Sequence, residues 1–163
     1  MKKYTHHFVS LMLAGLLAAS PAFARTESSA AAHIAFDVPD AWVTTSQGTS
    51  VVVRAPTGGV AIEFHVVANA AQAEQDLQQL DRVLATRLQG LVWDGDASPV
   101  SQHGLRGRMR RGHGMINGTE VGFLSALMGH AGGGVLVIAW VNRASLQANL
   151  PTMVNVLNSV RAT

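Results

Sequence analysis

Histidine is the residue type in this sequence that could most readily hold a metal ion or transfer a proton. A zinc or copper site needs three or four ligands that converge within about 2 Å of the ion. The chain contains no cysteine, and the spacing of its histidines offers no such set of ligands. The sequence therefore predicts neither a metal site nor a cofactor. The histidines that follow residue 24 are His33, His65, His103, His113 and His130.

The dipeptide Asn117-Gly118 is typical of a two-residue β-hairpin, and this turn fixes how far apart two of the histidines lie. In its register His113 and His130 are roughly 25 Å apart, at about 3.3 Å per residue, and cannot share a ligand. His103 and His130 could be diagonal neighbours on one face. If the protein is a small hydrolase or a ligand-binding enzyme, we expect its site in a groove beside Trp93, His103 and His130.

Nucleophilic catalysis has no recognisable motif here. No Gly-x-Ser-x-Gly elbow surrounds Ser125, Ser145 or Ser159, and no His or Asp stands in a triad context. The glycine run 132–134 is not followed by Lys and Ser or Thr, so a turn explains it better than a phosphate-binding loop. We therefore predict no catalytic residues.

The segment LRGRMRRGHG, residues 105–114, concentrates positive charge. Because side chains alternate along a strand, Arg106, Arg108 and Arg110 would project from one face. A functional interpretation is that this stripe docks an anionic partner or ligand. The simpler interpretation, a solvated sheet face, is favoured because surface charge clusters are common and no interleaved aromatic residues suggest base stacking.

The partner strand of this segment complicates both interpretations. The hairpin register places Phe123, Ser125 and Leu127 on the same face as the three arginines. Two explanations remain open. Either a bulge at Gly112 or Gly114 shifts the register, or the guanidinium groups cover Phe123 and Leu127 as amphipathic side chains do.

Residues 1–24 have the pattern of a secretory signal peptide. Lys2 and Lys3 precede an apolar stretch, 8–19, and Ala22-Phe23-Ala24 provides the small residues of a cleavage site. We expect cleavage between Ala24 and Arg25 and a periplasmic or secreted product. A dozen apolar residues are fewer than the roughly 20 that span a bilayer, and no cysteine is present for lipid attachment, so no membrane anchor is expected.

The net charge of the chain after cleavage gives no support to a nucleic-acid-binding protein. Both lysines leave with the leader, so ten arginines balance ten acidic residues and nothing favours a nucleic-acid partner. The segment 25–33 is small and polar, and we expect it to be a flexible N-terminal segment. Residues 34–163 are the size of one domain.

Hydrophobic periodicity predicts the elements of that domain. Alternating apolar residues indicate strands near 34–39, 51–56 and 60–67, and a continuous apolar run at 135–141 indicates a central strand. Leucines at helical spacing after Asn69 predict a helix that ends at Gly90, and Leu150-Pro151 opens a closing helix. The prediction is an α+β single domain, a largely antiparallel sheet packed by two helices, with Trp42 buried at a turn.

This order of elements resembles the Mog1/PsbP-like group, to which bacterial DcrB-like proteins belong. Two short matches carry the resemblance: Pro-Asp-Ala-Trp at 39–42 and Val-Leu-Asn-Ser-Val-Arg at 156–161. The resemblance implies a Mog1/PsbP-like sandwich and mostly non-catalytic roles, as assembly factors, adaptors or chaperone-like binders without a common active-site motif. The lipid-anchoring cysteine of DcrB-like lipoproteins is missing here.

The function that fits these features is a periplasmic or secreted, non-catalytic binding, adaptor or assembly-factor protein whose partner is another protein. A periplasmic immunity or inhibitor protein is an alternative, and a small hydrolase or ligand-binding enzyme is another. The residues predicted to bind are Arg106, Arg108, Arg110, His103, His130 and Trp93.

Overall fold

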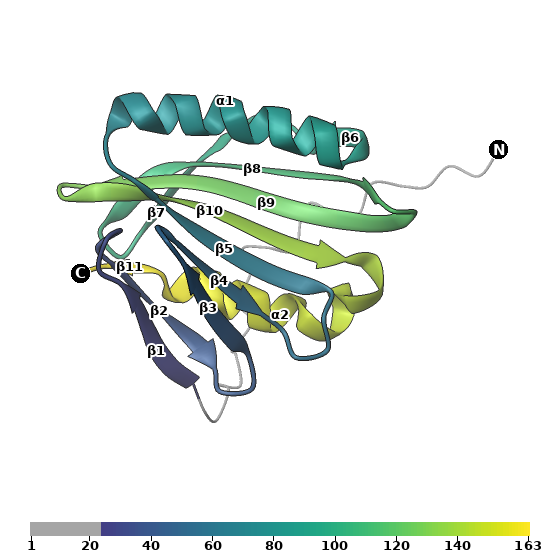
Figure 1. Ribbon diagram of the computed structural model, residues 1–163, viewed down its shortest axis with the longest axis horizontal. Helices are drawn as coiled ribbons and strands as arrows, with labels where there is room; N and C mark the ends of the chain where they lie inside the picture. The colour runs from purple at the N-terminus through teal and green to yellow at the C-terminus, as the bar shows by residue number, and fades with distance from the viewer. Residues whose placement is uncertain (1–23) are drawn as a thin grey trace.

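The computed structural model describes residues 24–163, apart from the side chains of residues 70, 71, 74 and 76, and Figure 1 shows its arrangement. The predicted signal peptide therefore lies outside the described residues except for Ala24. The strands are β1 (Ala24–Ser29), β2 (Ile34–Pro39), β3 (Val43–Gln47), β4 (Ser50–Arg54), β5 (Val60–Val67), β6 (Gln89–Trp93), β7 (Ser98–Gln102), β8 (Leu105–Ile116), β9 (Thr119–His130), β10 (Gly133–Asn142) and β11 (Arg161–Ala162). The helices are α1 (Ala70–Arg87) and α2 (Arg143–Ser159).

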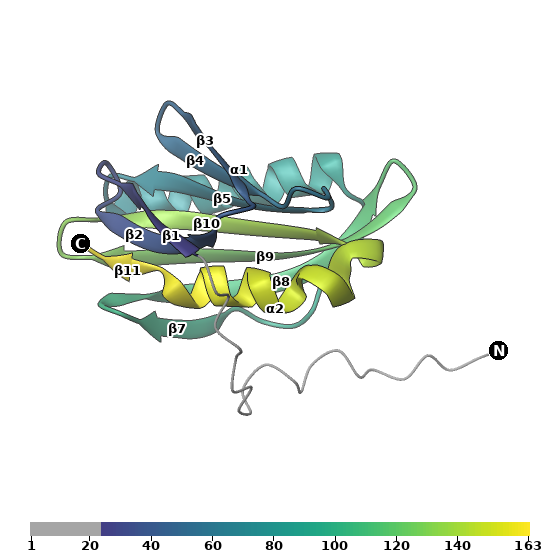
Figure 2. The same ribbon diagram turned by 90° about the horizontal axis from the view of Figure 1, so that it is seen from below.

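Within residues 24–163 the strands form two antiparallel sheets. The large sheet has eight strands in the order β3-β4-β5-β10-β9-β8-β6, with β7 also paired to β8. The small sheet has the order β1-β2-β11. Helix α1 covers one face of the large sheet, and α2 and the small sheet lie against the other (Figures 1 and 2). The predicted α+β domain, a largely antiparallel sheet with two helices, is confirmed.

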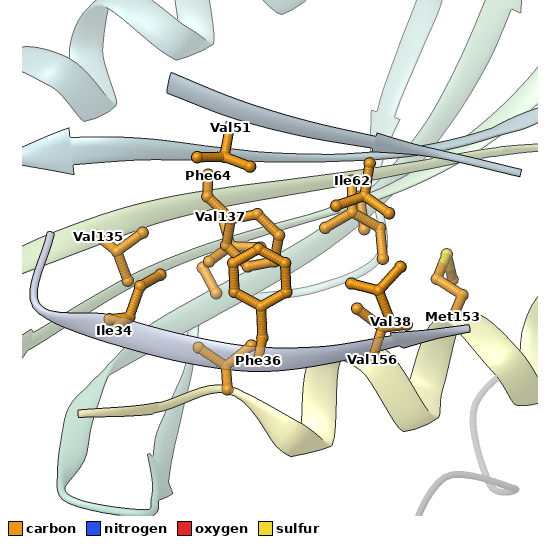
Figure 3. Close-up of a cluster of buried hydrophobic side chains, with 14 of the residues drawn as sticks. Ile34, Phe36, Val38, Val51, Ile62, Phe64, Val135, Val137, Met153 and Val156 are labelled. Atoms are coloured by element: carbon orange, nitrogen blue, oxygen red, sulfur yellow. The ribbon is translucent and has the colours of Figure 1, made fainter. Parts of the chain in front are cut away.

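The core between the large sheet and the α2 layer joins the two sheets. Phe36 of β2 stacks on Phe64 of β5 with ring centroids 4.1 Å apart and planes 16° from parallel. Both rings are buried, and Val38 of β2 and Val156 of α2 extend the same apolar cluster (Figure 3). Burying this much apolar surface is the main driving force for the packing of one sheet on the other.

Trp42 lies in the turn that leads from the small sheet to β3. Its backbone N–H donates to the carbonyl oxygen of Pro39 at 2.9 Å, which closes the turn. Its side chain is only 6% exposed and belongs to the core cluster. The predicted burial of Trp42 is confirmed.

The N-terminal segment was expected to be flexible, and for its first part that expectation is wrong. Residues 24–29 form β1, an edge strand that pairs with β2 along its whole length. The guanidinium of Arg25 donates to the carbonyl oxygens of Pro39, Asp40 and Trp42 at distances from 2.8 to 3.2 Å. Backbone pairing and the contacts of Arg25 thus order a segment that has few apolar side chains to bury.

The two helices differ from their predicted limits. Asn69 caps α1 as expected, since its side chain accepts from the backbone N–H of Gln72 at 2.9 Å, but the helix ends at Arg87 and Gly90 lies in β6. Helix α2 begins at Arg143, well before Leu150-Pro151, because Asn142 caps it through the N–H of Ser145. Neither helix has the length and apolar character needed to cross a membrane, and the described residues contain no other helix.

Asp37 of β2 links the three strands of the small sheet through its side chain. Its carboxylate accepts from both terminal nitrogens of Arg161, at 3.1 and 3.2 Å, and from the hydroxyl of Thr26 at 2.7 Å. The hydrogen bonds from Arg161 hold the pKa of Asp37 below its ordinary value of 3.8, and they outweigh the opposing effect of partial burial.

The lowered pKa makes this contribution to stability pH-dependent. A carboxyl group with a lowered pKa stabilises the fold above its ordinary pKa, and the stabilisation is lost as the pH falls through the folded pKa. We expect Asp37→Asn to be less stable than the parent at pH 7, and this difference to shrink when urea melts are repeated near about pH 3. A difference that stays the same at both pH values would contradict the role of Asp37.

Candidate functional site

The ladder between β8 and β9 fixes where the arginine segment faces. Ile116 pairs with Thr119, and the register continues without a shift to Arg108 opposite Leu127 and Arg106 opposite Gly129. The register predicted from the Asn117-Gly118 turn is confirmed. The alternative of a bulge at Gly112 or Gly114 is wrong.

Those two glycines make room for large neighbours instead. A Cβ atom on Gly112 would lie 2.7 Å from the ring of Phe123 and 2.6 Å from the carbonyl oxygen of Val92. A Cβ atom on Gly114 would lie 3.1 Å from the Cβ of Leu88. The glycines therefore let an aromatic ring and the end of α1 lie directly on the strand.

Three aromatic rings form a layer on the face of the large sheet that α1 covers. Phe123 lies edge-on to Trp93 with centroids 5.2 Å apart, and on its other side it contacts Trp140 at 5.6 Å. Leucines of α1, among them Leu80 and Leu84, complete this second core cluster. The layer lies beside the arginine segment on the same face of the sheet.

Arg110 lies over this aromatic layer. Its guanidinium carbon is 3.7 Å from the centroid of the Trp93 ring, a cation–π contact, and one terminal nitrogen is 3.6 Å from the carboxylate of Asp81 in α1. The side chain is 33% exposed. Arg110 thus covers an aromatic ring, as one of the two alternatives predicted, but the ring is that of Trp93 and not Phe123.

Arg106 and Arg108 behave differently from Arg110. Both side chains are exposed, and neither forms an ion pair with any described acidic residue. Arg108 makes a single long hydrogen bond, 3.4 Å, to the carbonyl oxygen of Ala97. We call Arg106, Arg108 and Arg110 the arginine face. Within the arginine face, Arg110 packs against the ring of Trp93, whereas Arg106 and Arg108 project into solvent.

A pocket of about 240 Å³ opens between α1, the connection 94–97 and the arginine face. The side chains of Arg108, Arg110 and Ser125 line it from the sheet, opposite Leu77 of α1. Asp96 and Ala97 line it from the connection.

Ser125 is the buried polar side chain of this site, at 5% exposed, and no other polar side chain is buried among the described residues. Its hydroxyl makes no hydrogen bond within the described part of the chain, and it lines the pocket. Sequence reasoning placed Ser125 on the arginine face but gave it no role. The signal that marks it is its register position directly opposite Arg110.

The predicted groove beside Trp93, His103 and His130 does not form. Trp93 pairs with Gly112, whereas His130 follows the pair of Gly129 with Arg106 at the other end of the ladder. The separation along β8 is seven residues, roughly 23 Å at about 3.3 Å per residue. The structure therefore joins Trp93 to the arginine face and leaves the two histidines elsewhere.

His130 has a structural role at the far end of the sheet. Its Nδ1 accepts from the backbone N–H of Gly132 at 3.0 Å, so its Nε2 carries the proton donated to the carbonyl oxygen of Ala32 at 3.1 Å. The ring beside it belongs to His33, with centroids 6.0 Å apart, and His103 lies in the turn between β7 and β8. No group of three or more potential metal ligands occurs among the described residues.

Comparison with solved structures places this architecture among known folds. CyanoP, the cyanobacterial PsbP from Synechocystis sp. PCC 6803, aligns with a TM-score of 0.65 over 93% of this chain and 99% of its own, at 10% sequence identity. The chain has the Mog1/PsbP-like fold. The resemblance stated from the order of elements is confirmed.

Two further structures share the Mog1/PsbP-like arrangement with this chain. LpqN of Mycobacterium tuberculosis, which is involved in cell envelope biogenesis, aligns with a TM-score of 0.50 and 14% identity over 80% of this chain and 83% of its own. PA94 of Pseudomonas aeruginosa, a protein of unknown function, aligns with a TM-score of 0.52 and 15% identity over 83% of this chain and 94% of its own. No family model and no curated protein sequence matches the chain.

Proposed function

We propose that this chain is a non-catalytic binding or adaptor protein that works outside the cytoplasm and docks an acidic protein partner on its arginine face. The observation that carries the proposal is the pair of exposed guanidinium groups on Arg106 and Arg108. They lie two residues apart on one side of a strand, and neither has an acidic partner among the described side chains. Like charges held side by side repel, and an external anionic surface relieves that repulsion.

The location outside the cytoplasm is supported by residues 1–24, whose pattern predicts a cleaved signal peptide. It is also supported by the fold, since LpqN, which shares it, is involved in cell envelope biogenesis. The non-catalytic role is supported by the separation of Trp93 from His103 and His130, which removes the groove in which catalysis was considered.

Affinity capture tests this function. The mature chain, starting at Arg25, serves as bait in a periplasmic extract, and a bait with an arginine replaced away from the arginine face, Arg143→Gln, serves as the control because Arg143 lies on α2 and pairs with Glu120. We expect both baits to enrich the same protein, and an Arg106→Glu, Arg108→Glu double variant to lose it. Enrichment of no protein by the parent bait, or equal enrichment by the double variant, would contradict the proposal.

A further inference from the structure

We propose that the pocket between Ser125, Arg108 and Arg110 is a carboxylate receptor that accepts one acidic side chain of a protein partner. This inference rests on the proposed function and deepens it, because it assigns the point of the arginine face at which an acidic segment is recognised.

The pocket contains hydrogen-bond donors that the described part of the chain uses only in part. Arg110 has an ion pair with Asp81 at 3.6 Å but no hydrogen bond among the described residues, and Arg108 makes only the long one to Ala97. The hydroxyl of Ser125 also makes no hydrogen bond within the described part of the chain, and it lines the pocket, where it can donate to a bound group. A carboxylate in the pocket is an acceptor that these donors can share.

The geometry of the donors matches a carboxylate. An ionised carboxylate has two oxygens with about four acceptor sites and can accept two parallel bonds from one guanidinium. Arg110 is held in place by stacking on Trp93 and by its ion pair with Asp81, and its guanidinium makes no hydrogen bond within the described part of the chain. A donor that is already ordered loses less conformational entropy when it binds, so Arg110 is preorganised for this role.

The size of the pocket favours a single side chain over a free metabolite. Its volume of about 240 Å³ is below the range of about 300–1,000 Å³ that is typical for small-molecule sites. Leu77 and Ala97 provide an apolar wall against which the methylene groups of a glutamate can pack. Asp96, also on the wall, opposes an anion and should limit the affinity.

A peptide titration followed by backbone NMR signals tests this receptor. The probe is the blocked peptide acetyl-Ala-Glu-Ala-Glu-Ala-amide, and the matched control peptide carries Gln in place of Glu. We expect the Glu peptide to bind and to shift the signals of Ala97, Arg108 and Ser125, and the Gln peptide to bind at least about tenfold more weakly, since charge-assisted hydrogen bonds are lost.

Variants of the chain locate the site. Ser125→Ala and Arg108→Gln should each weaken binding of the Glu peptide by about three- to tenfold or more, because each removes a donor to the carboxylate. Arg106→Gln removes the same charge from the same strand outside the pocket and should weaken binding by about threefold at most. Asp96→Asn removes the opposing charge and should tighten binding.

The outcomes separate this inference from the proposed function. Equal binding of the Glu and Gln peptides, or unchanged binding by both Ser125→Ala and Arg108→Gln, would overturn the receptor while leaving partner capture intact. Acetate or inorganic phosphate that binds the pocket more tightly than the Glu peptide would also overturn it, in favour of a site for free anions. Loss of partner capture with intact peptide binding would overturn the proposed function alone.

Discussion

Replacing Trp42 by alanine is expected to lower the free energy of unfolding by about 3–5 kcal/mol, a large share of the stability of a single domain. The indole is 6% exposed and belongs to the cluster that joins the two sheets. Its truncation removes apolar contacts and leaves a cavity at the turn, which the backbone bond from Trp42 to Pro39 restrains from collapsing. Urea denaturation measures the change.

Val43 provides the matched control for this prediction. It follows Trp42 directly in the chain but is 58% exposed. Val43→Ala is therefore expected to change the free energy of unfolding by about 0.5 kcal/mol or less. A Trp42→Ala variant as stable as Val43→Ala would show that the indole does not anchor the turn.

The second large effect is expected at Gly112, which supports the aromatic layer beneath Arg110. A methyl group there meets the Phe123 ring and the carbonyl oxygen of Val92, both closer than atoms normally approach. Gly112→Ala should therefore displace Phe123 or separate β6 from β8, at a cost of about 1–3 kcal/mol. Because Trp93 lies edge-on to Phe123, its fluorescence should change as well.

Gly122 on the paired strand is the control for Gly112. Its added Cβ atom would lie 3.8 Å from the side chain of Val141 and 4.0 Å from the carbonyl oxygen of Gly112, both ordinary contact distances. Gly122→Ala is expected to be neutral or to stabilise by up to about 1 kcal/mol, since alanine has less conformational freedom in the unfolded chain. If both alanine variants were equally stable, the space around Gly112 would not be limiting.

The parts of the fold that could be predicted are those set by local chemistry. The Asn117-Gly118 turn fixes a ladder of paired residues, because a two-residue turn leaves one register. Asn69 starts α1 because its side chain satisfies a free backbone N–H at the helix end. Alternation of apolar residues identified β2 and β5, since each has one face in the core.

The parts that could not be predicted depend on distant contacts. The strand β1 has few apolar side chains, and its order comes from pairing with β2 and from the contacts of Arg25 with the 39–42 turn. Pro151 suggested a helix start, but Asn142 caps α2 earlier and the proline lies inside the helix. Local signals at a proline can thus be outweighed by a better cap upstream.

The candidate site was predicted only in part for the same reason. Alternation placed the three arginines and Ser125 on one face, which the ladder confirms. The contact of Arg110 with Trp93 depends on how β6 pairs with β8, and that pairing shifts register between Gln89 and Val92. The sequence carries no local signal for such a shift, so neither the cation–π contact nor the pocket could be deduced from it.

The most direct test of partner docking on the arginine face is the salt dependence of capture by the parent and by the Arg106→Glu, Arg108→Glu double variant. Attraction between exposed charges is screened over about 10 Å at 0.1 M salt, so capture should weaken between about 50 and about 300 mM NaCl. We expect the parent to lose partner with increasing salt, and the double variant to capture none at either concentration while its urea midpoint stays unchanged. If the double variant captured the partner at the parent's level and without salt dependence, the partner would not dock on the arginine face.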